Sequence, residues 1–181
     1  MCNNAYGRGA NFSFKLASKA STFDIERIKL KDYPWFFVDM SSAGREVTVR
    51  WSSNFQFVGF DHMGHSVVID ADRPNGEGTG MRPMALLLAA LGGCTGMDIV
   101  QGLKKFGQSL KGLEVKVSGE VNEKLPHYYT KIRVHYLVKG ESIDKAVLER
   151  VIKESDELFC SVGATIKGRA EILTSYEIVE V

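Results

Sequence analysis

The sequence predicts an α+β fold in which antiparallel strand meanders surround a buried central helix, with a second helix later in the chain. Stretches in which apolar and polar residues alternate, typical of half-buried strands, occur before and after one long apolar stretch. That apolar stretch is rich in strong helix formers and is too long for a strand. The predicted order is three strands, a helix, two strands, a helix and a strand, which argues against a doubly wound sheet.

The first meander begins at Glu46, where apolar residues alternate with Thr48 and Arg50. A glycine-containing turn over residues 61–64 interrupts it. Its apolar members are Val47, Val49, Trp51, Phe55, Phe57, Phe60, Val67, Val68 and Ile69.

The central helix follows a glycine-rich loop, residues 72–82, and begins at Pro83, a residue that the first helical turn tolerates. Residues 84–106 are apolar nearly all the way round for about three turns, which predicts a helix buried on every side. Its glycines each cost about 1 kcal/mol relative to alanine. We therefore expect another backbone or a ligand to come close to the thiol of Cys94, and Asp98, one turn later, to share its face.

Two further strand-like stretches, residues 113–121 and 131–139, form the second meander. Ser142 is a good N-cap for a helix over residues 143–158, which carries one apolar face. A strand over residues 170–181 completes the domain.

Composition excludes several classes of protein. With 44% hydrophobic and 25% charged residues the chain is typical of a soluble globular protein, and its net charge of +1 gives no field that would attract nucleic acid. The longest apolar stretch falls short of the roughly 20 residues of a membrane span. Three cysteines without CxxC spacing favour a reducing cytoplasm. We expect no nucleic-acid or membrane partner.

Residues 1–45 differ from the rest of the chain. Their first 22 residues have no acidic side chain and no clean periodicity, and the whole segment carries an excess of positive charge. We therefore divide the chain into an N-terminal extension of unknown role, residues 1–45, and a folded domain, residues 46–181.

The residues leave the role of the cysteines open. Cys94 and Cys160 are either small apolar side chains of the core or a reactive pair. His62 and His65 flank the turn beside Asp61, but a polar hairpin tip explains them more simply than a metal site. We expect no metal and no cofactor.

A family resemblance favours the reactive pair. The segment GMRPMALLLAALGGCTGMD, residues 80–98, resembles the central-helix motif of the OsmC/Ohr family, osmotically inducible protein C and the organic hydroperoxide resistance proteins. The segment CSVGATIKG, residues 160–168, resembles the second motif of that family. GGCTGMD and VTVRW are more similar to the YhfA-like branch than to the true peroxidases. The resemblance covers residues 46–181.

The resemblance implies an OsmC-like fold, an intertwined homodimer and a two-cysteine site at the subunit interface. It implies that Cys94 attacks the O–O bond of an organic hydroperoxide, that Cys160 resolves the sulfenic acid, and that a dithiol reductant restores both thiols. The substrate-binding residues would be apolar ones at the start of the helix, namely Met84, Leu87, Leu88 and Leu91.

The sequence departs from the family at the helix start. Peroxidase members place a Glu after the proline to hold an Arg beside the thiol, whereas this chain has Met84 there. Arg73 and Arg82 are the two candidates for that Arg. Two functions therefore stay open: a thiol-dependent organic hydroperoxide reductase, or a non-catalytic binding protein for a hydrophobic small molecule. A thiol hydrolase ranks third, because neither cysteine motif contains a histidine.

Overall fold

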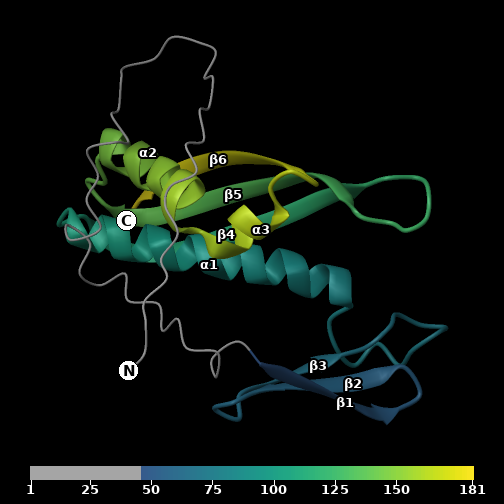
Figure 1. Cartoon of the computed structure of the whole chain (residues 1–181). Helices are drawn as coiled ribbons and strands as arrows, with labels where there is room; N and C mark the ends of the chain where they lie inside the picture. Colours follow the sequence, from purple (N-terminus) through teal and green to yellow (C-terminus); the bar gives the residue numbers. More distant parts are fainter. Residues whose placement is uncertain (1–45) are drawn as a thin grey trace, which may run out of the picture. The chain divides into compact units, whose positions relative to one another are not determined.

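The computed structural model describes residues 46–181, so the predicted N-terminal extension, residues 1–45, lies outside the described residues. Within the described part the chain forms two three-stranded sheets and a set of helices (Figure 1). The predicted order of strands and helices is confirmed, with one additional short helix before the last strand.

The first sheet contains β1 (Val47–Ser53), β2 (Gln56–Asp61) and β3 (Ser66–Ile69), in that order and antiparallel. Val49 is paired with Gly59 and Gly59 with Val67, so their side chains share one face of the sheet. In the described chain much of this apolar face is exposed, at Val47, Val49, Trp51, Phe57 and Val67.

The second sheet has the order β4 (Ser109–Val121), β5 (Tyr129–Glu141) and β6 (Glu171–Glu180). β4 and β5 form an antiparallel hairpin, whereas β6 runs parallel to β5. The predicted last strand is thus present, but it does not extend the antiparallel meander. A parallel neighbour requires a crossover connection, and the helical residues between β5 and β6 supply it.

That crossover begins with α2 (Lys145–Glu154). The prediction of Ser142 as its N-cap is wrong: the cap is Asp144, whose Oδ1 accepts the backbone N–H groups of Ala146 at 2.8 Å and Val147 at 3.4 Å. Ser142 instead has a φ of 50°, in the left-handed region of the turn after β5. The predicted helix covers residues 143–158, but the α-helix ends at Glu154. A π-helical turn, η4 (Ser155–Phe159), follows it.

The sequence did not predict α3 (Ser161–Ile166), which begins directly after Cys160. Six residues are too few to show a helical period.

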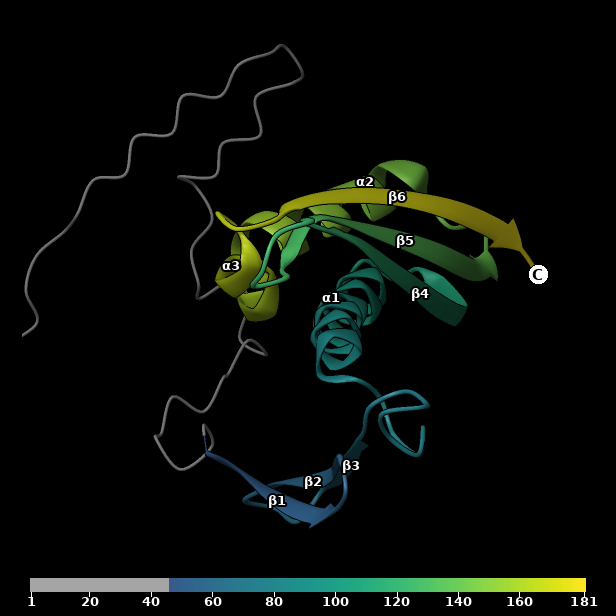
Figure 2. The same cartoon turned by 90° about the vertical axis from the view of Figure 1, so that its right-hand side faces the viewer.

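α1 (Pro83–Lys105) lies along one face of the second sheet and also contacts α2 and α3 (Figures 1 and 2). Leu91, Ile99 and Leu103 are completely buried on this side of the helix. By length and composition alone α1 would also pass as a membrane-spanning helix. Its contacts with the sheet and with both neighbouring helices place it in the core of the described domain.

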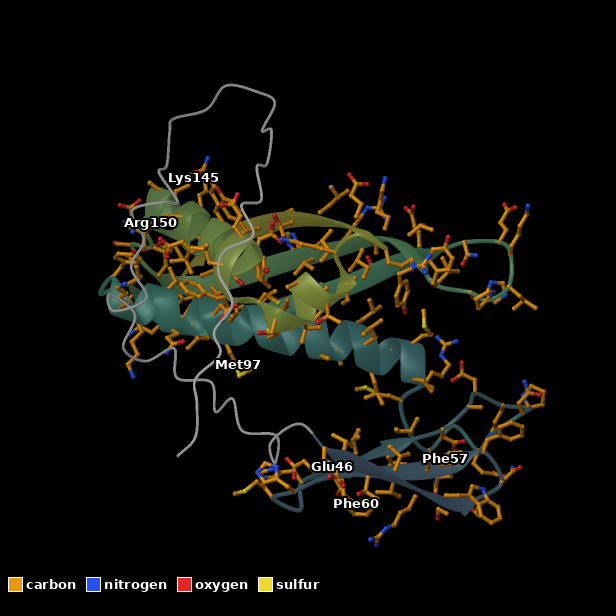
Figure 3. The ribbon with its side chains drawn as sticks, in the orientation of Figure 1. Glu46, Phe57, Phe60, Met97, Lys145 and Arg150 are labelled. Carbon is orange, nitrogen blue, oxygen red and sulfur yellow. The ribbon has the colours of Figure 1, made fainter. Side chains whose placement is uncertain are left out.

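The prediction that α1 is buried on every side is wrong. Leu87 and Val100 are exposed, and Met97 is 69% exposed and projects away from the second sheet (Figure 3). Among residues 46–181, the second sheet and the two helices cover one half of α1, and the apolar residues of the other half are exposed.

Glycines set how closely α1 approaches its neighbours. A Cβ atom at Gly92 would lie 2.9 Å from Val117 Cγ2, and one at Gly96 would lie 3.4 Å from Val115 Cγ2. These two glycines thus make room for valine side chains of β4, whereas a Cβ atom at Gly93 would meet nothing within 4 Å. The approach of another backbone or a ligand to the Cys94 thiol stays a prediction. At Gly102 a Cβ atom would lie 2.5 Å from Val151 Cγ1 of α2, so this glycine sets the spacing of the two helices.

We predict that Gly102→Ala lowers the free energy of unfolding by up to about 2 kcal/mol, because overpacking costs about 1–3 kcal/mol and helix propensity returns about 1 kcal/mol. Urea denaturation followed by circular dichroism measures the change. The control is Val151→Ala, which removes the clashing methyl groups. The double variant should lose less stability than the sum of the two single variants, and strict additivity would contradict the proposed contact.

Candidate functional site

The two cysteines and one carboxylate meet beneath α1. Cys94 and Asp98 are four residues apart on α1 and therefore share a face, as predicted. Cys160 follows η4 and lies against the same face. The two Sγ atoms and a carboxylate oxygen of Asp98 all lie within 4.8 Å of one another. The structure thus brings together two thiols that are far apart in the sequence.

The backbone around Cys160 holds its thiol in place. The N–H of Cys160 donates to the carbonyl of Ser155 at 2.9 Å, which closes the π-helical turn. Its Sγ accepts the N–H of Gly163 at 3.2 Å and so caps α3. A Cβ atom at position 163 would lie only 3.2 Å from this sulfur, which explains the glycine there. Cys160 is 5% exposed, whereas Cys94 is half-buried.

Ser155, the first residue of η4, connects this turn to α1. Its hydroxyl donates to Asp98 Oδ2 at 2.7 Å, and Ser155 itself is almost completely buried. Burial raises the pKa of Asp98, and the hydrogen bond from Ser155 opposes that rise. Sequence reasoning missed Ser155, because the residue carries no motif and reaches Asp98 only through the tertiary fold.

The cluster lies in an environment that disfavours negative charge. Burial raises the pKa of the Cys160 thiol to about 12, and the nearby Cys94 and Asp98 add to the rise. Burial likewise raises the pKa of Tyr136, on β5, to about 12. Both groups are therefore neutral at pH 7, and the Cys160 side chain is a thiol rather than a thiolate.

The two candidate arginines lie in the loop before α1. Arg73 donates through Nε to the carbonyl of Glu77 at 3.2 Å, and Arg82 forms an exposed ion pair with Asp72 at 3.2 Å. The same loop is braced by Asp70, which accepts the N–H and the hydroxyl of Thr79; these hydrogen bonds lower its pKa. These described partners of both arginines belong to the loop and not to the cysteine cluster.

The four predicted substrate-binding residues fall into different surroundings. Met84 and Leu88 line an open, largely apolar groove of about 720 Å³. Tyr129 also lines it and donates its hydroxyl to the carbonyl of Met84 at 3.1 Å. Leu87 is instead exposed on α1, and Leu91 is buried in the core. The structure thus brings two of the four residues to one groove.

Hydrogen bonds to Asp61 organise the histidine turn. His65 Nδ1 lies 2.8 Å from Asp61 Oδ2, while Asp61 Oδ1 accepts the N–H groups of Met63 and His65. Asp61 therefore serves as the cap of the hairpin turn.

We predict that Asp98→Asn raises the free energy of unfolding at pH 7. A carboxyl whose pKa is raised by folding destabilises the folded state once it ionises, and a neutral amide of the same shape avoids that cost. The gain should shrink as the pH falls through the raised pKa toward the ordinary value of 3.8, where the native carboxyl is protonated in both states. Urea denaturation of both proteins between pH 7 and pH 4 measures the difference. A constant difference across that range would contradict the burial of a titrating Asp98.

The chain is similar to a known protein family and to a known bacterial protein. The family model described as OsmC-like protein matches residues 76–175. Protein YhfA of Escherichia coli K12 is 32% identical over 134 residues, which cover 74% of this chain and 98% of the relative.

Solved structures have the same fold. A hypothetical protein from Aquifex aeolicus VF5 is 31% identical with a TM-score of 0.67, and the match covers 75% of this chain and 96% of that one. An organic hydroperoxide resistance protein OsmC from Legionella pneumophila has a TM-score of 0.57 at 16% identity, covering 73% and 95% of the two chains. At that identity the likeness concerns the fold alone. The family match and the YhfA relative establish that this chain belongs to the OsmC/Ohr family, near YhfA.

Proposed function

We propose that this protein is a thiol-dependent reductase of organic hydroperoxides that uses Cys94 and Cys160 as its redox pair. The observation that carries the proposal is the convergence of both sulfur atoms and a carboxylate oxygen of Asp98 within 4.8 Å. Membership of the OsmC/Ohr family supports a redox role, and hydroperoxide resistance proteins from Legionella pneumophila and Bacillus subtilis have the same fold.

The proposed reaction has three steps. The Cys94 thiolate attacks one oxygen of the peroxide O–O bond, which gives a Cys94 sulfenic acid and releases the other oxygen as an alcohol. Cys160 then attacks the sulfenic sulfur, and water leaves as the disulfide forms. A dithiol reductant restores both thiols by exchange and is itself oxidised to a disulfide. No resident cofactor takes part.

Cys94 is the proposed attacking thiol because it is half-buried and therefore accessible, whereas Cys160 is enclosed. Asp98 is the proposed local proton carrier. Its raised pKa suits a group that accepts the thiol proton and returns it to the leaving alkoxide. Arg73 or Arg82 would have to leave its loop partner to assist the thiolate, and Met84 supplies no carboxylate to hold it there. We therefore expect turnover slower than in the peroxidases of the family.

We predict that a slight excess of cumene hydroperoxide removes two hydrogens from each reduced subunit and leaves a Cys94–Cys160 bridge. Intact mass and peptide mapping follow the reaction, with Cys2→Ser as the background so that only two thiols remain. Cys94→Ser should abolish peroxide consumption, and Cys160→Ser should stop at a sulfenic acid that dimedone traps.

A second function is favoured by the apolar groove beside Met84 and Leu88. If both thiols persist while the peroxide binds, the protein is a non-catalytic binder of hydrophobic small molecules. Continued turnover in Cys94→Ser would separately overturn the role of Cys94.

We further propose a homodimer, in a reducing cytoplasm, as the working form. Within the described residues, the apolar face of β1–β3 exposes Trp51 at 66%, and the outer half of α1 exposes Met97 at 69%. Exposed apolar patches mark interaction surfaces. A second copy of the chain would cover both.

Light scattering should therefore give about twice the chain mass of 20.1 kDa. Val49→Lys places a charge on the apolar face of β1 and should shift the protein toward monomer, because burying that charge in an interface is costly. Thr48→Lys is the matched control, since Thr48 is exposed on the opposite face of the same strand. A monomeric native protein, or equal effects of the two variants, would contradict the proposed interface.

A further inference from the structure

We propose that Cys94, Asp98 and Cys160 form a binding site for a thiophilic divalent cation of the Zn²⁺ type when both thiols are reduced. The sequence did not predict a metal site, because a CxxC or HxxH pattern is absent from these positions and the third donor comes from another element. The inference does not rest on the proposed peroxidase activity. It rests on the donor set and its surroundings.

The donor atoms match the preference of Zn²⁺. Two sulfurs and one carboxylate oxygen are ligands of zinc sites, whereas Mg²⁺ and Ca²⁺ take oxygen alone. Two sulfurs each about 2.3 Å from a tetrahedral zinc lie about 3.8 Å apart. The donors here lie within 4.8 Å of one another, so closure onto a metal requires a shift of about 1 Å. Cys94, which is half-buried on α1, can supply that shift by rotating its side chain.

Two donors already have the outer partners that metal ligands commonly have. The Ser155 hydroxyl donates to Asp98 Oδ2, which orients the carboxylate and leaves Oδ1 for a metal. The N–H of Gly163 donates to the sulfur of Cys160, a contact that also stabilises a thiolate. Both donors are thus oriented before any metal binds.

Charge and access are consistent with an open site. The other side chains described at the cluster, Thr95, Tyr136 and Ser155, carry uncharged hydroxyl groups. A divalent cation would supply the missing positive charge, and in binding it would replace the two thiol protons, which pass to solvent. Because Cys94 and Asp98 are only half-buried, water can complete a fourth position, as in zinc sites that keep an open coordination place.

Binding should depend on the redox state. A Cys94–Cys160 disulfide would engage both sulfurs and leave Asp98 alone, which is too little to hold the metal. Zinc on the reduced pair would, in turn, occupy the thiolates and shield them from oxidation.

The test titrates the reduced full-length protein with Zn²⁺ against a chromophoric chelator, under anaerobic conditions and in the Cys2→Ser background. Co²⁺ serves as the spectroscopic probe, since tetrahedral cobalt with thiolate ligands gives intense visible bands and a sulfur-to-cobalt charge-transfer band. We expect one metal per subunit with that spectrum. The disulfide form should bind at least about tenfold more weakly.

Variants assign the ligands. Cys94→Ser and Cys160→Ser should lose the charge-transfer intensity. Asp98→Asn should weaken Zn²⁺ binding at least about tenfold, because even the removal of a residue that hydrogen-bonds to a metal ligand typically costs that much affinity. Asp156→Asn is the matched control, because this nearby carboxylate pairs with Lys167 outside the cluster. Circular dichroism checks that every variant is folded.

An octahedral cobalt spectrum, equal effects of Asp98→Asn and Asp156→Asn, or undiminished binding by the disulfide form would each overturn the proposal. Binding without peroxide turnover would support the metal site while refuting the peroxidase, so the two failures can be told apart.

Discussion

The packing of α1 against its neighbours is the constraint on which the site depends. Gly92 and Gly96 let the helix approach β4, and Gly102 lets it approach α2. A Cβ atom at Gly92 or Gly102 would lie under 3.0 Å from a valine side chain, so the helix or the valine would have to shift. A shift of the helix would also move the face that carries Cys94 and Asp98. The glycines weaken α1 as an isolated helix, but in the folded domain they bring its reactive face against the crossover segment.

The crossover then places the second half of the site. α2 ends in the π-helical turn η4, and the turn closes with a hydrogen bond from Cys160 to Ser155. Ser155 faces Asp98, and Cys160 faces Cys94. A π-helical turn is rare and is frequently found at functional sites. Here it aims a hydroxyl and a thiol at the same helix from one short segment.

The electrostatics of the cluster connect the two proposals. Burial keeps Cys160 and Tyr136 neutral and raises the pKa of Asp98, while the candidate arginines are engaged in the loop before α1. Release of the Cys94 thiol proton requires an acceptor close by or a cation that replaces the proton. Asp98 answers the first need in the peroxidase proposal, and a bound divalent cation answers the second in the metal proposal.

The sequence by itself determined the order of elements, the central helix, and the shared face of Cys94 and Asp98, because these follow from local periodicity and helical spacing. Only the tertiary structure decided the parallel pairing of β6, the cap at Asp144, and the meeting of Ser155 and Cys160 with α1. Those features depend on contacts between residues distant in the chain, for which one sequence carries no periodic signal. The exposure of one half of α1 is also a tertiary feature, since it depends on which of the described elements pack against the helix.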